Sequence, residues 1–72
     1  MHISSLRSLL ALRTPVSLTV LTSKGEIQTY DGCISLRWDR AKGTRNIKLP
    51  NGQIRRIRDV MILAANNHEV YL

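Results

Sequence analysis

The sequence predicts a mainly β domain, in which a short N-terminal helix precedes a five-stranded, strongly bent small barrel. Apolar residues recur at helical spacing only before Pro15, and from Val16 onward their period changes to two. Turn sequences that contain glycine divide the period-two region into short segments. The 72 residues include no linker and no low-complexity segment, so residues 1–72 are expected to form a single small domain.

The helix is expected over about residues 4–13. Its apolar side chains share one side of a helical wheel, and they are Ile3, Leu6, Leu9, Leu10 and Leu12. Ser4 or Ser5 is expected to cap its first turn, and Pro15 ends it. Because so short a helix is marginal in water on its own, we expect it to dock on the open side of the sheet.

The first two strands are expected to flank a tight turn at residues 23–26. Val16, Leu18 and Val20 alternate with polar residues, which predicts a half-buried strand. The next strand is expected to be long, from about residue 26 to residue 38.

This second strand is expected to bend at Gly32. Ile27 is at an odd position, whereas Ile34, Leu36 and Trp38 are at even positions. A glycine where the phase changes indicates a bulge, which lets one strand serve two sides of a barrel. We expect Ile34 and Leu36 to share a core face with Trp38, although Trp38 could instead stack on a base or fill an interface.

The remaining strands are expected at residues 44–49, 53–58 and 60–65, with a short final strand possible at 69–72. Ile47 and Leu49 are expected to point inward, as are Val60 and Ile62. The Pro-Asn-Gly sequence that follows Leu49 is a strong hairpin signal. A helix followed by short, bent strands is typical of a small Greek-key or SH3-like barrel.

Charge is the strongest functional signal. The net charge is +6, and the segment from Arg37 to Arg58 carries eight basic residues and one acid, Asp39. A field of one sign on a β scaffold is typical of a polyanion-binding surface. The candidate nucleic-acid-binding residues are Arg40, Lys42, Arg45, Asn46, Arg55, Arg56 and Arg58. Arg55 and Arg56 are adjacent, so a regular strand would point them to opposite faces and the patch need not be contiguous.

The partner is left open by the sequence. Aromatic residues are scarce, so phosphate contact is favoured over base stacking, and RNA and DNA are equally compatible. The alternative is a protein-interaction module whose basic face, or whose edge at residues 69–72, meets an acidic protein. A core this small favours a homo-oligomer. The single Cys33 cannot form an internal disulfide, which favours a cytoplasmic location.

Enzymatic chemistry is not expected. Asp31, Asp39 and Asp59 each fall at a predicted turn or loop, where Asp serves local hydrogen bonds. The chain has no nucleophile elbow and no phosphate-binding glycine loop, and one cysteine is too few for a structural zinc site. We therefore expect no cofactor and no metal, and no membrane-spanning segment.

The order of these parts resembles the Sm/Lsm-like small barrels, which include the Hfq-type RNA chaperones. The first family motif would correspond to Gly32, Asp39 and the segment 46–49 (Asn-Ile-Lys-Leu), with a longer gap between Asp and Asn than the family shows. The second would correspond to residues 57–62, where Asp59 stands in place of the family's glycine. The resemblance implies a ring that binds RNA, with Asn46 and Arg58 lining its site.

Overall fold

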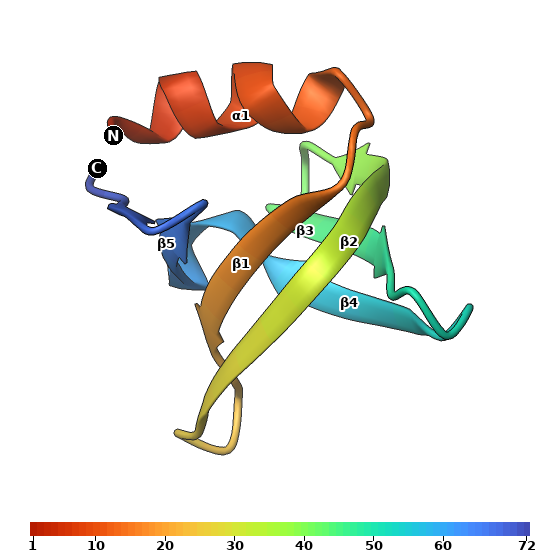
Figure 1. Ribbon diagram of the computed structural model, residues 1–72. Helices are drawn as coiled ribbons and strands as arrows, with labels where there is room; N and C mark the ends of the chain where they lie inside the picture. Colours follow the sequence, from red (N-terminus) through yellow and green to blue (C-terminus); the bar gives the residue numbers. More distant parts are fainter.

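The computed structural model describes all residues, 1–72. In chain order the elements are α1 (Ile3–Ala11), β1 (Val16–Leu21), β2 (Ile27–Asp39), β3 (Thr44–Lys48), β4 (Ile54–Arg58), the 3₁₀ turn η1 (Asp59–Met61), β5 (Ile62–Ala65) and β6 (His68–Glu69). The strands form one antiparallel sheet in the order β4-β3-β2-β1-β5-β6. The sheet curls around a common core, and α1 lies across one of its open ends (Figure 1). The predicted mainly β, barrel-like fold with an N-terminal helix is confirmed.

The helix starts earlier than its serines predicted. His2 is the N-cap, and its Nδ1 accepts a hydrogen bond from the backbone N–H of Ser4 at 3.1 Å. Ile3, Leu6 and Leu10 are buried against the sheet, so the predicted docking is confirmed. Leu12 follows the last helical residue and is 67% exposed, so the apolar stripe is narrower than predicted.

The bend of β2 at Gly32 is confirmed as a β-bulge. Val16 pairs with Cys33 and Leu18 pairs with Tyr30, so β2 has one residue more than β1 over this stretch. Gly32 adopts a φ of +70°, which glycine reaches without the Cβ strain of other residues. The bulge turns the outer half of the strand across the sheet, as the long diagonal path of β2 shows (Figure 1).

A second bulge makes the predicted core face of β2 wrong. Cys33 and Ser35 are the buried residues of this half-strand, while Ile34 and Leu36 are half-buried on the other side. The pairing with β3 then slips again between Ser35 and Arg37. The parity that they share with Trp38 predicted an inward position for Ile34 and Leu36, but this slip changes the parity after Ser35.

The region after β4 also differs from prediction. Val60 was expected inside a strand, yet it lies in η1 and is 52% exposed, because the chain turns there before β5 begins at Ile62. The final strand is β6, two residues long. Beyond it, the carbonyl of Tyr71 accepts a hydrogen bond from the N–H of Ile3 at 2.8 Å. The two chain ends therefore lie side by side near the start of α1 (Figure 1).

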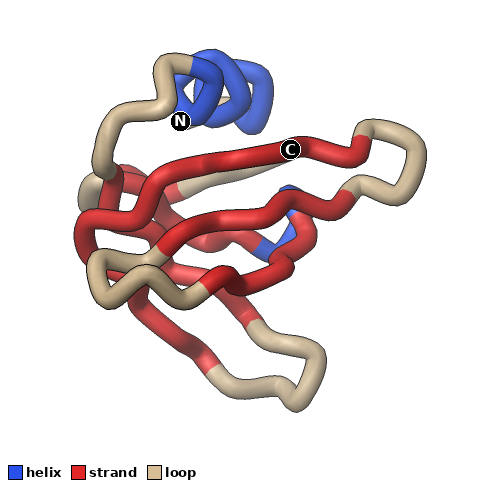
Figure 2. Tube along the Cα trace, turned by 90° about the vertical axis from the view of Figure 1, so that its right-hand side faces the viewer, coloured by secondary structure: helices blue, strands red, loops and turns tan.

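The core consists of side chains from α1 and every strand except β6. The rotated view shows the helix on one side of the curled strands (Figure 2). Its buried members are Ile3, Leu6, Leu10, Val16, Leu18, Val20, Cys33, Ile47, Ile57, Ile62 and Ala65. Leu49, predicted to point inward, packs against this cluster and is partly buried.

Candidate functional site

The face of β2, β3 and β4 that points away from the core collects most of the exposed cations. Strand register places Arg37, Asn46 and Arg56 in one row across the three strands. Thr44 and Arg58 form the neighbouring pair of the same face. We define the outer basic face by the exposed or half-buried residues that share it, Arg37, Lys42, Thr44, Asn46, Lys48, Arg56 and Arg58.

A polar hollow of about 270 Å³ opens on this face. It is lined by six polar residues and no apolar ones, namely Arg37, Asp39, Lys42, Thr44, Asn46 and Arg56. Its single carboxylate serves the loop, since Oδ1 of Asp39 accepts the backbone N–H of Lys42 at 3.2 Å. Three cations against one carboxylate leave the lining positive, which suits an anion such as a phosphate.

The cations of this face have no carboxylate partners. The structure contains two ion pairs, Arg7–Asp59 and Arg45–Asp59, and neither involves the outer basic face. Arg37 and Arg56 are both exposed. Their guanidinium groups are therefore free to contact a ligand without first breaking an internal pair.

The structure brings some predicted site residues together and separates others. Lys42, Asn46 and Arg56 line the hollow, and Arg58 lies beside them. Arg40 lies instead near the ring of Trp38, with its guanidinium carbon 5.9 Å from the ring centroid. Arg55 is exposed but belongs to the opposite face of β4 from Arg56, as the alternation of a strand requires.

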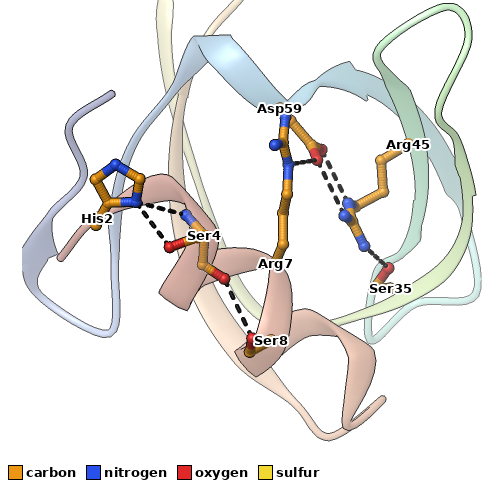
Figure 3. A network of polar contacts seen from close by, with 7 residues as sticks. All are labelled: His2, Ser4, Arg7, Ser8, Ser35, Arg45 and Asp59. Carbon is orange, nitrogen blue, oxygen red and sulfur yellow. Dashed lines mark hydrogen bonds and ion pairs between the residues drawn. The ribbon is translucent and has the colours of Figure 1, made fainter.

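Arg45 lies in the interior and not on the surface. It is 4% exposed, and its guanidinium makes a two-pronged pair with Asp59, with Nε–Oδ1 at 2.9 Å and Nη2–Oδ2 at 3.0 Å. Nη1, the third nitrogen of the guanidinium, donates to Oγ of Ser35 at 2.7 Å (Figure 3). The expectation of a ligand-binding Arg45 is corrected here, because all three nitrogens of its guanidinium already have partners.

Asp59 was expected to make local turn bonds, and this expectation is also wrong. Its side chain is fully buried, and its partners are distant in sequence. In addition to Arg45, it accepts a 3.3 Å hydrogen bond from Nε of Arg7, whose side chain extends from α1 toward Asp59 (Figure 3). The carboxylate thus joins the helix, β3 and η1 at one point.

Trp38 completes this cluster as a half-buried residue. The guanidinium carbons of Arg7 and Arg45 lie 4.9 Å and 5.3 Å from its ring centroid. A cation over an indole face is attracted by the ring quadrupole. The ring therefore packs among arginines beside the apolar core, and guanidinium groups occupy surface that a base would need for stacking.

The sequence prediction left out three members of the outer basic face, Thr44, Lys48 and Arg37. Of these, Arg37 lies opposite Asn46 and lines the hollow. A regular strand would put it on the same side as buried Ser35, but the slip between these two residues turns it outward opposite Asn46. No glycine or proline marks the position, so the sequence carried no local signal for this bulge.

Cys33 is buried in the core, as predicted for an inert thiol. Its Sγ donates a 3.4 Å hydrogen bond to the carbonyl of Val16. Burial raises the pKa of the Cys33 thiol above its ordinary value, so the thiolate is disfavoured. No three side chains of the metal-ligating types gather anywhere in the structure.

No helix has the length and apolar character needed to cross a lipid bilayer. Comparisons of the chain with protein-family models, curated proteins and solved structures found no match. The resemblance to Sm/Lsm-like barrels accordingly stays a prediction, based on the order of elements and on the positions of Gly32, Asn46 and Arg58.

Proposed function

We propose that this protein binds nucleic acid on its outer basic face, mainly through phosphate contacts. The observation that carries the proposal is the polar hollow, in which Arg37, Lys42 and Arg56 converge without a salt-bridge partner. Lys and Arg that neutralise phosphates release condensed counterions, and this release is the main source of affinity for such surfaces.

The polar residues between the cations suit a second kind of contact. The Asn46 amide both donates and accepts hydrogen bonds, and the Thr44 hydroxyl does the same. Both line the hollow, where Asn46 lies between Arg37 and Arg56 in the strand register and Thr44 lies in the neighbouring row. They would contact a sugar or a base edge while the arginines bind the phosphates of the nucleic acid. The resemblance to Sm/Lsm-like barrels favours RNA as the ligand.

Fluorescence anisotropy with labelled RNA, single-stranded DNA and duplex DNA, titrated at several salt concentrations, tests the proposal. We expect the logarithm of affinity to fall linearly with the logarithm of salt, with a slope of about 0.7 per neutralised phosphate on a single strand. Absence of binding to all three probes at low salt would contradict the proposal.

A pair of variants separates this face from general positive charge. Arg37→Ala/Arg56→Ala removes two cations from the hollow and should reduce the salt slope by about 1.4 on single strands. Arg13→Ala/Lys24→Ala removes the same charge from exposed positions outside the outer basic face and serves as the matched control. Equal losses in the two variants would show that net charge alone attracts the ligand.

We also propose that the protein forms a homo-oligomer, which would be a ring if the resemblance to Sm/Lsm-like barrels holds. Size-exclusion chromatography with light scattering, with and without RNA, measures it directly. A monomer in both conditions would remove the ring from the proposal and leave the phosphate contacts unchanged.

A further inference from the structure

The strand β4 is one edge of the sheet. The hydrogen bonds that it makes with β3 show which of its backbone groups point outward. The backbone N–H of Leu49 donates to the backbone carbonyl of Gln53 at 2.8 Å, and the backbone N–H of Asp59 donates to the backbone carbonyl of Gly43 at 3.2 Å. Bonded pairs alternate along an antiparallel ladder, so the backbone groups of the odd-numbered residues 53–59 face β3. The N–H and C=O groups of Ile54 and Arg56 therefore point away from the sheet. No strand pairs with them, and the carbonyl of Ile54 accepts a 3.4 Å hydrogen bond from Nη1 of the exposed Arg55 side chain.

A groove of about 790 Å³ runs beside this edge. Its apolar lining residues are Val20, Leu21, Tyr30, Ile57 and Met61. Three arginines of β4 also line it, Arg55, Arg56 and Arg58. An unpaired strand edge next to an apolar groove is the arrangement that accepts an added strand from another chain.

We propose that the β4 edge binds an extended, acidic segment of a partner protein, which pairs as an additional strand and fills the groove. Residues opposite one another in antiparallel strands project on the same face. A partner residue opposite Arg56 would thus point toward the outer basic face, where a carboxylate is favoured. Its two neighbours would point into the groove, one beside Ile57 and Met61 and one beside Arg55. Apolar side chains are favoured at both places, because the aliphatic stem of an arginine also packs against apolar groups. The expected ligand alternates acidic and apolar residues.

The charge of the edge argues for a partner protein over a second copy of this chain. β4 contains three arginines and no acid. Two copies of β4 paired with each other would place like charges opposite or diagonal to one another, which is destabilising. The other free edge, β6, offers only His68 and Glu69. This inference does not depend on nucleic-acid binding, although the hollow and the groove share Thr44 and Arg56.

The probe is a synthetic peptide in which Glu alternates with Val, added to the full chain. Two control peptides match it, one with the same residues sorted into a Glu block and a Val block, and one in which Lys replaces Glu. We expect the alternating peptide to bind about tenfold more tightly than either control. Equal binding of the sorted peptide would overturn the proposal, because charge alone would then account for it, and so would no binding of the alternating peptide.

Amide hydrogen exchange followed by NMR identifies the site. The amides of Ile54 and Arg56 should exchange rapidly in the free protein and become protected with the alternating peptide, because the added strand accepts their hydrogen bonds. The amides of Arg55 and Ile57 serve as internal controls, since β3 already protects them. Protection elsewhere on the molecule would overturn the proposal.

Two further outcomes are decisive. Arg56→Glu keeps the backbone edge and reverses the charge, so it should weaken the Glu–Val peptide and strengthen the Lys–Val peptide. Protection of Ile54 and Arg56 that rises with protein concentration in the absence of peptide, together with dimers by light scattering, would assign the edge to a second copy and overturn the proposal.

Discussion

Arg45 and Arg56 lie on adjacent strands and illustrate two uses of the same residue. Arg45 pairs in register with Ile57, and Arg56 pairs with Asn46, so the two side chains leave the hairpin on opposite faces. Arg45 is buried with Asp59 and Ser35, while Arg56 is exposed at the rim of a positive hollow and has no ion pair. The phase of the strand, and not proximity in the sequence, decides which arginine is buried beside a carboxylate and which stays exposed at the hollow.

The energetics of the two arginines differ for the same reason. A buried guanidinium loses its hydration and is tolerated only with good geometry and satisfied donors, which Asp59 and Ser35 supply. An exposed guanidinium keeps its water and contributes little to stability. Variants that exchange or remove these groups therefore test the contrast directly.

The largest effect is expected from removing the charge of Asp59. Asp59→Asn leaves Arg45 buried without a counter-charge, which should lower the free energy of unfolding by about 3–5 kcal/mol. Urea unfolding followed by circular dichroism measures the loss. Asp39→Asn, in the hollow, is the matched control and should change stability by less than about 0.5 kcal/mol.

A double variant distinguishes the unpaired charge from damage to the packing. Arg45→Met/Asp59→Leu replaces the pair with apolar side chains and should be more stable than Asp59→Asn alone. A double variant that is less stable than Asp59→Asn would show that shape, and not charge, accounts for the first result.

A medium effect is expected from changing the shape of each cation while keeping its charge. Arg45→Lys loses the two-pronged geometry toward Asp59 and should cost about 1–3 kcal/mol, because buried acceptors are left unsatisfied. Arg56→Lys should stay within about 0.5 kcal/mol. Equal effects on the urea midpoint would remove the contrast between the two arginines.

The bulge at Gly32 helps to decide which side chains of β2 face the core. Substitutions of Gly32 therefore test how much the backbone conformation at this position contributes to stability. Gly32→Ala places a Cβ at φ +70°, 3.4 Å from Cγ of Pro50, and should cost about 1–2 kcal/mol. Gly32→Asn should cost less, because Asn tolerates this conformation better. Thermal unfolding of both variants provides the measurement, and an Asn variant less stable than Ala would contradict the conformational explanation.

The smallest effect is expected from the buried thiol, and only at alkaline pH. Because burial raises the pKa of Cys33 in the folded state, the unfolded chain loses its thiol proton first as the pH rises. The thiol's contribution to stability is therefore full below its ordinary pKa and declines as the pH rises above it. Urea unfolding from neutral to alkaline pH should show a steeper decline in the wild-type chain than in Cys33→Ala, and parallel declines would contradict this assignment.

The sequence predicted the parts of the fold that local chemistry encodes. The helix, the Gly32 bulge and the hairpin after Leu49 depend on periodicity, glycine conformation and turn residues, which lie within a few positions of one another. The second bulge before Arg37 carries no such marker. Because this bulge could not be predicted, Ile34 and Leu36 were assigned to the wrong face of the strand.

The candidate site was predicted less well, because its composition depends on pairing between distant residues. Arg45 looks like any other cation until Asp59, fourteen positions later, is placed beside it. Of the residues predicted for the site, Lys42, Asn46 and Arg56 line the hollow. Arg37 was omitted from the predicted site, although the parity predicted for Leu36 and Trp38 places it on the outer side of its strand.

Trp38 is the only tryptophan of the chain, and its position makes it an internal optical reporter. Its indole lies close to the guanidinium groups of Arg7, in α1, and of Arg45, in β3. Detachment of the helix would remove the first cation and admit water to the ring, whereas opening of the barrel would remove both. The intrinsic emission of one residue should therefore distinguish undocking of α1 from loss of the whole barrel.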